Sequence, residues 1–101
     1  MIELWQSPAF AAWLRSLKDK PARARIAARV QRLAFGQFGD VRPLGEDVSE
    51  LRIHFGPGWR VYFVQRGPVP IVLLWGGDKA SQDRDIAQAL RMARHIDREE
   101  A

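Results

Sequence analysis

The sequence predicts an α+β domain with the element order β-α-α-β-β-β-β-α, in which two N-terminal helices pack on a twisted, mainly antiparallel sheet. Near both ends of the chain, apolar residues recur at spacings of three and four, which is typical of helices. Over residues 41–75 they alternate with polar residues or form short runs, which is typical of strands. At 101 residues, 47% of them hydrophobic, the chain predicts one domain over residues 1–101.

The N-terminal third predicts a short strand over residues 2–5 and then two helices. Ser7 and Pro8 favour a helix start, because serine caps free N–H groups and proline is tolerated in the first turn. One apolar stripe follows at Phe10, Trp13, Leu14 and Leu17. The segment Asp19–Pro21 interrupts it and caps a second helix, which we expect to end near Gly36. The stripe of that helix comprises Ile26, Val30 and Leu33.

The later elements are also visible in the pattern. Residues 41–44 predict a marginal strand, because Pro43 cannot donate a ladder hydrogen bond. Residues 66–70 close a hairpin, and residues 71–75 are apolar on both faces, as in a central strand that is covered on both sides. Residues 76–81 predict a Gly-rich turn, after which a C-terminal helix begins. Its apolar side comprises Ile86, Ala89, Leu90, Ala93 and Ile96.

The most informative segment is residues 50–63, ELRIHFGPGWRVYF, which predicts a β-hairpin. Apolar and polar residues alternate through both halves. With the turn centred on Pro57, the predicted cross-strand partners are Phe55 with Trp59, His54 with Arg60, and Arg52 with Tyr62. Two guanidiniums, an imidazole and a phenol would then share one face, and that set suits phosphate chemistry better than core packing.

Cleavage of a phosphodiester needs cations against the charge of the transition state and groups that move protons. Arg60 and Arg52 could stabilise that charge, His54 could act as base or acid, and Tyr62 could position or stack on a nucleotide. Lys79 follows the central strand and could reach the same face. The alternatives are a solvated hairpin face and an ordinary surface lysine. The candidate catalytic residues are Arg60, Arg52, Lys79, His54 and Tyr62.

The charge pattern favours an acidic partner. The formal net charge is +4, and thirteen of the sixteen basic residues are Arg, whose planar fork grips phosphate or carboxylate. Residues 15–32 carry seven basic residues and one acidic residue, a net charge of +6. The candidate nucleic-acid contacts are Arg25, Arg29 and Arg32 on one helix face, with Arg42 and Trp75. An acidic partner protein or a solvated face would also explain the stripe, and core packing would explain Trp75.

Several classes of function lack support. The chain has no Cys and only two separated His residues, so we expect no metal site and no cofactor. No phosphate-binding or dinucleotide-binding glycine motif is present. The sequence shows no export signal and no apolar run of membrane-spanning length, so we expect a cytoplasmic protein without membrane contact.

The segments Ser49–Ile53, Gly56–Phe63 and Gly76–Lys79, followed by Gln82-Asp-x-Asp-Ile86, resemble the RelE/ParE toxin superfamily. The likeness is closest to its phage-derived, HigB-like branch, the addiction module killer proteins. The resemblance implies a RelE-like fold and the toxin of a bacterial type II toxin–antitoxin system. It also implies a metal-independent endoribonuclease that cleaves mRNA in the ribosomal A site, where the 2′-hydroxyl attacks the adjacent phosphate.

Arg60, Arg52 and Lys79 match basic positions of that superfamily. His54 departs from the commoner acidic or polar residue, and Trp75 and Asp78 lie where some members carry a late-strand Tyr or His. The proton-transfer group therefore stays open.

The implied partners are the ribosome with its mRNA and a cognate antitoxin, a helix-turn-helix protein of the HigA-like kind, through which alone operator DNA would be contacted. The alternatives are a ParE-like, non-catalytic DNA gyrase poison and an inactive, RNA-binding relative.

Overall fold

The elements follow one another in the predicted order. A computed structural model describes residues 1–67 and 70–100, so the predicted loop at 66–70 lies partly outside the described residues. The elements are β1 (Leu4–Gln6), α1 (Pro8–Ser16), α2 (Lys20–Leu33), β2 (Val41–Gly45), β3 (Val48–Ile53), β4 (Trp59–Val64), β5 (Ile71–Gly77), a 3₁₀ turn η1 (Lys79–Ser81) and α3 (Gln82–Glu100). No helix in these described ranges is both long and apolar enough to cross a membrane.

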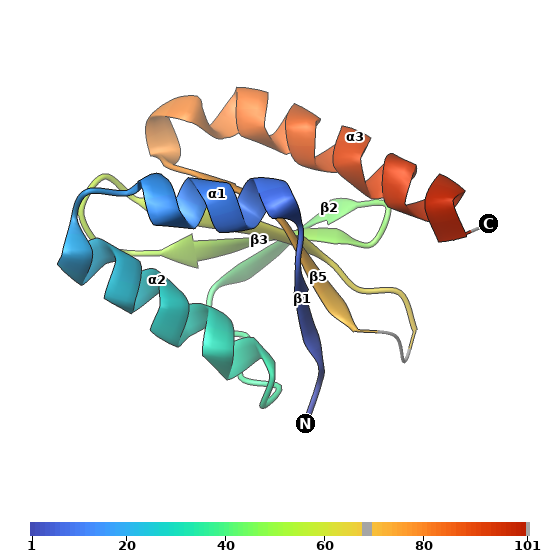
Figure 1. Cartoon of the computed structure of the whole chain (residues 1–101), viewed down its shortest axis with the longest axis horizontal. Coiled ribbons are helices and arrows are strands. Elements are labelled where there is room, and N and C mark those ends of the chain that lie inside the picture. The colour runs from blue at the N-terminus through green and yellow to red at the C-terminus, as the bar shows by residue number, and fades with distance from the viewer. Residues whose placement is uncertain (68–69, 101) are drawn as a thin grey trace.

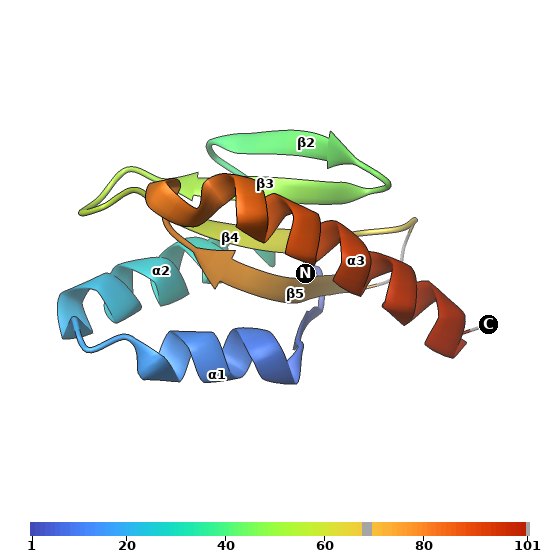
Figure 2. The ribbon, with the colours of Figure 1, turned by 90° about the horizontal axis from the view of Figure 1, so that it is seen from above.

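The five strands form one mixed sheet with helices on both faces (Figures 1 and 2). The strand order is β1-β5-β4-β3-β2, with β1 parallel to β5 and the other neighbours antiparallel. One apolar cluster lies between the sheet and the α1–α2 pair, and a second lies between the sheet and α3. The α+β class and the largely antiparallel sheet are thus confirmed.

The two N-terminal helices begin where the sequence predicts. Ser7 Oγ accepts a hydrogen bond from Phe10 N at 2.9 Å and donates to Leu74 O at 2.8 Å, so the cap also ties α1 to β5. Asp19 Oδ1 accepts from Ala22 N at 3.0 Å at the start of α2. Three residues of the two predicted stripes are fully buried: Phe10, Ile26 and Leu33.

The hairpin forms, but its predicted register is wrong by two residues. The observed partners are Ile53 with Trp59, Arg52 with Arg60, and Glu50 with Tyr62. The reason is a wider connection, residues 54–58, in which Gly56 and Gly58 take positive φ angles of 58° and 80°. Because side chains alternate with a period of two, this slip changes the partners and keeps the faces. His54 and Phe55 leave the strand for the loop.

The sequence placed the candidate catalytic residues of the hairpin on one polar face. In the structure this face is not an open surface. It faces α3, which covers most of it, because Arg52, Arg60 and Tyr62 all point to the side opposite α1 and α2. Only the end of β3 and β4 nearest the start of α3 stays accessible to solvent. The candidate site is therefore confined to that end.

Gly76 and Gly77 are the last residues of β5 and not part of a turn, which corrects the predicted turn at 76–81. Both are needed for close approach. A Cβ atom at Gly76 would overlap the indole ring of Trp13 in α1, and one at Gly77 would overlap the carboxylate of Asp85 in α3.

The close approach of α1 to β5 yields a stability prediction. We expect Gly76→Ala to lower the free energy of unfolding by about 1–3 kcal/mol, because the methyl group must displace the Trp13 ring. Urea denaturation followed by circular dichroism measures the change. Trp13→Leu should make room, so the double variant should lose less than the sum of the single losses. Additive losses would show that the two positions do not compete for space.

Candidate functional site

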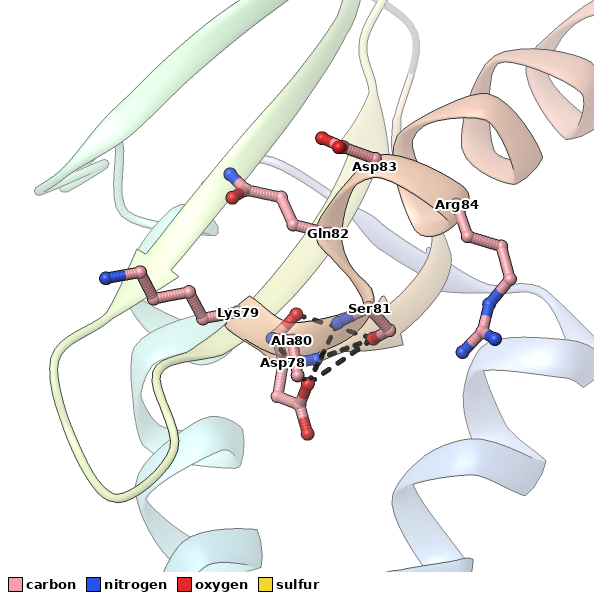
Figure 3. Close-up of a pocket in the computed structure, with 7 residues that line it drawn as sticks. All are labelled: Asp78, Lys79, Ala80, Ser81, Gln82, Asp83 and Arg84. Carbon is pink, nitrogen blue, oxygen red and sulfur yellow. Dashed lines mark hydrogen bonds between the residues drawn. The ribbon is translucent and has the colours of Figure 1, made fainter.

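An open groove of about 630 Å³ lies where the β3–β4 loop meets the start of α3. We call it the basic groove, and its polar lining residues are Arg52, His54, Arg60, Lys79 and Gln82. Four of the five predicted catalytic residues are among them. Figure 3 shows Lys79 and Gln82 extending to the side of the β3–β4 loop, whereas Arg84 extends to the opposite side. The sheet and η1 thus bring together residues that lie far apart in the sequence.

Arg60 is the most buried cation of the groove, with 7% of its surface exposed. Its position in β4 places it opposite Arg52 in β3 and opposite Gly77, which has no side chain, in β5. One terminal nitrogen donates to the carbonyls of Gly58 and Trp59, at 3.1 and 3.3 Å. Its buried Nε has no hydrogen-bond partner among the described residues. This free N–H suits an anionic ligand.

Among the described residues, Trp59 Nε1 is the other buried side-chain nitrogen or oxygen without a hydrogen-bond partner. Trp59 does not line the groove. Nothing in its surroundings explains why it lacks a partner.

Two further cations stand beside Arg60. Arg52 is directly across the ladder, and its Nε donates to Glu50 Oε1 at 3.1 Å. Lys79 is exposed and begins η1, where Asp78 Oδ1 accepts from the backbone N–H groups of Ala80 and Ser81. That cap, drawn in Figure 3, fixes the backbone from which Lys79 extends.

His54 is paired with an acid that the sequence did not indicate. His54 Nε2 donates to Asp40 Oδ2 at 2.6 Å, and 73% of the imidazole stays exposed. The hydrogen bond from His54 and the nearby charges of His54, Arg52 and Arg60 hold the pKa of Asp40 below its ordinary value. Asp40 lies in the loop before β2, and no spacing in the sequence links it to the hairpin, so only the fold reveals the pair.

The basic face of α2 adjoins the basic groove. A second open groove, of about 640 Å³, is lined by Arg25, Arg29 and Arg32 and shares Arg52, His54 and Phe55 with the first. The guanidinium of Arg25 lies 4.4 Å from the centre of the Phe55 ring, a cation–π arrangement. The predicted stripe and the predicted hairpin cations therefore form one continuous positive surface.

Tyr62, predicted to handle protons or stack on a nucleotide, is fully buried beneath α3, so that prediction is wrong. Its hydroxyl donates to Glu50 Oε2 at 3.2 Å. Burial, together with the charge of Glu50, raises the pKa of Tyr62 above its usual range. A phenol that is neutral and enclosed cannot exchange protons with a ligand in the groove.

Two predicted nucleic-acid contacts lie outside both grooves. Trp75 packs with the apolar cluster beneath α3, and its indole N–H donates to Asp85 Oδ1 at 2.9 Å. Core packing, the alternative for this residue, accounts for it. Arg42 extends from the edge strand β2, half exposed, with its Nε 3.9 Å from Glu50 Oε1. Among the residues that the structure describes, the His, Asp and Glu side chains form no group of three that could hold a metal ion.

The chain has a close relative in Haemophilus influenzae. This relative, described as an "Uncharacterized protein", is 43% identical over 95 residues, which cover 94% of this chain and 96% of the relative. The chain therefore belongs to the same family as the Haemophilus protein. No protein-family model and no solved structure matches this chain.

The single tyrosine allows a direct test of its burial. The raised pKa means that the folded protein keeps Tyr62 neutral, so this group contributes stability below pH 10, and the contribution is lost as the pH rises further. We expect no phenolate absorbance at about 295 nm until the protein unfolds in alkali. Phenolate forming near pH 10 while the circular dichroism spectrum stays native would contradict the enclosed environment.

The Asp40–His54 pair predicts a carboxyl titration. We expect His54→Ala to raise the pKa of Asp40 toward its ordinary value, because the main cause of the lowering is removed. A carboxyl whose pKa is lowered by folding stabilises the fold at pH values above its ordinary pKa. This contribution is lost as the pH falls through the pKa of the folded state. Carboxyl ¹³C NMR measures the change. Glu46, whose pKa the hydrogen-bonded Arg94 keeps low, is the internal control and should not move.

Proposed function

We propose that this protein is a RelE-like toxin that acts as an endoribonuclease on mRNA at the ribosome. The observation that carries the proposal is the buried Arg60 guanidinium, with a free Nε, in a groove lined by Arg52, Lys79 and His54. Such a site suits a ligand whose negative charge grows during reaction. The resemblance of the hairpin and the Gly-Gly-Asp-Lys segment to the HigB-like branch supports the same reading.

The groove offers a complete set of groups for attack by a 2′-hydroxyl. His54 takes the proton of the 2′-hydroxyl, whose oxygen then bonds to the adjacent phosphorus, and Asp40 stabilises the imidazolium that forms. The Arg60 guanidinium donates to a non-bridging phosphate oxygen, and Arg52 and Lys79 balance the added negative charge. The 5′-oxygen leaves with a proton from the imidazolium, which yields a cyclic 2′,3′-phosphate and a 5′-hydroxyl end.

The second groove, along α2, can bind nucleotides on either side of the cleaved linkage. Arg25, Arg29 and Arg32 contact flanking phosphates, which positions the strand without reading its sequence. The Arg25 guanidinium, which lies over the Phe55 ring, provides a planar cation on which a base stacks. This surface suits single-stranded mRNA better than a duplex, because stacking needs an unpaired base.

The same proposal implies the protein's setting. The chain acts in the cytoplasm, where ribosomes are, and needs no metal or other cofactor. A helix-turn-helix antitoxin of the HigA-like kind inhibits it by covering the positive surface, and operator DNA is contacted only through that antitoxin.

Removal of the central cation gives the decisive measurement. We expect Arg60→Ala to slow mRNA cleavage by about 100- to 1,000-fold, the effect of losing one preorganised donor to a developing charge. Primer extension on mRNA from ribosomes mixed with the purified protein locates and quantifies the cuts. Arg84→Ala is the matched control, because it removes the same charge from a side chain that points away from the groove (Figure 3).

Three results would contradict the proposal. Cleavage at the wild-type rate by Arg60→Ala would remove its central residue. Intact transcripts with DNA damage in induced cells would favour a ParE-like gyrase poison. Harmless expression at good soluble yield would favour an inactive, RNA-binding relative.

A further inference from the structure

Glu50 is a buried carboxylate at a position where packing alone would favour an apolar residue. None of its surface is exposed, and it lies on the α3 face of the sheet beside Tyr62. Burying a carboxylate is costly unless hydrogen bonds and opposite charge compensate. The fold therefore retains this acid at a cost that its partners must offset.

Its hydrogen-bond partners come from three different elements, and Arg42 in β2 adds a longer ion-pair contact at 3.9 Å. Glu50 accepts hydrogen bonds from Arg52 Nε in β3 at 3.1 Å, from Tyr62 OH in β4 at 3.2 Å and from Gln82 Nε2 in α3 at 2.9 Å. Two of these partners, Arg52 and Gln82, line the basic groove together with Arg60. Glu50 itself has no contact with solvent. It thus connects the core beneath α3 to two side chains that line the groove with the central cation.

The bonds to Glu50 fix how these two side chains are presented. A carboxylate only accepts, so the Gln82 amide must turn its nitrogen to Glu50, which leaves the carbonyl oxygen for the groove. The other polar side chains that line the groove belong to Arg52, His54, Arg60 and Lys79. Arg52 is held by Nε, so its terminal nitrogens stay available although the like charge of Arg60 is directly opposite.

We propose that Glu50 is a positioning residue: it holds the Arg52 guanidinium toward the scissile phosphate and the Gln82 carbonyl toward a hydroxyl or amine of the bound nucleotide. This inference rests on the proposed function for the identity of the ligand. The positioning itself rests only on the three hydrogen bonds and on the complete burial of Glu50.

The test compares Glu50→Gln with Asp85→Asn. Asp85 is a second buried carboxylate of this face and accepts from Trp75 and Ser81, neither of which lines the basic groove. Both variants neutralise one buried acid and keep its shape. The first readout is hydrogen exchange of the Arg52 Nε–H and the Gln82 amide by ¹⁵N NMR, which needs no RNA. The second is single-turnover cleavage of ribosome-bound mRNA, which separates the maximal rate from the half-saturating concentration.

We expect Glu50→Gln to accelerate exchange of both groups and to lower the maximal rate about 10- to 100-fold, the effect of a misplaced catalytic group, with little change in half-saturation. Asp85→Asn should leave the two exchange rates and the maximal rate unchanged. Both variants should lower the melting temperature, because each removes a buried charge from its hydrogen-bond donors. Adding Glu50→Gln to Arg52→Ala should cost much less than it does in the wild-type background, because most of the effect of Glu50 passes through Arg52.

Unchanged hydrogen-exchange rates in folded Glu50→Gln would overturn the inference. It would also be overturned if Glu50→Gln lowered the maximal rate by the same factor in the Arg52→Ala background as in the wild type. If Glu50→Gln does not fold, Glu50→Asp serves in its place, because it keeps the charge and withdraws it by one methylene. Wild-type protein that cleaves no mRNA would overturn the proposed function, and the exchange rates would then still decide whether Glu50 holds the two side chains.

Discussion

Two arginines stand directly opposite each other where β3 ends and β4 begins, and the surrounding structure is arranged to tolerate this pair. Like charges in that arrangement repel. Arg52 is drawn toward the carboxylate of Glu50, whereas Arg60 turns its terminal nitrogen to the carbonyls of Gly58 and Trp59. On the other flank of Arg60, Gly77 presents no side chain. The charges are therefore kept close together and only one of them is neutralised, which is a property of binding sites more than of cores.

Two buried acids on the α3 face, Glu50 and Asp85, have a different role from the cations. Glu50 and Asp85 are each surrounded by donors and lie at or near the start of α3, so their hydrogen bonds join this helix to the sheet. The basic groove lies immediately beyond them. Because its cations outnumber its acidic neighbours, the groove carries a net positive charge that attracts anions. An RNA phosphate would neutralise that charge, and so would the acidic surface of an inhibitory partner.

The sequence was sufficient for the order of elements and for the convergence of Arg52, His54, Arg60 and Lys79, because caps, periodicity and strand alternation are local signals. It was insufficient for features that depend on distant parts of the chain. The hairpin register depended on the positive φ angles of Gly56 and Gly58. The burial of Tyr62 depended on the position of α3, which no pattern in the hairpin sequence indicates. Asp40 meets His54 only because the loop before β2 passes the end of β3.

The central position of β5 has a consequence for how the molecule comes into being. This strand is the last of the five to be synthesised, yet it joins β1 to β4, and the bond between Ser7 and Leu74 spans 67 residues. A nascent chain that lacks β5 has no partner for β1 and no edge on which to complete the sheet. Folding dominated by such distant pairings is slow compared with the folding of helical bundles. The positive surface is therefore assembled only after β5 has been synthesised and has left the exit tunnel.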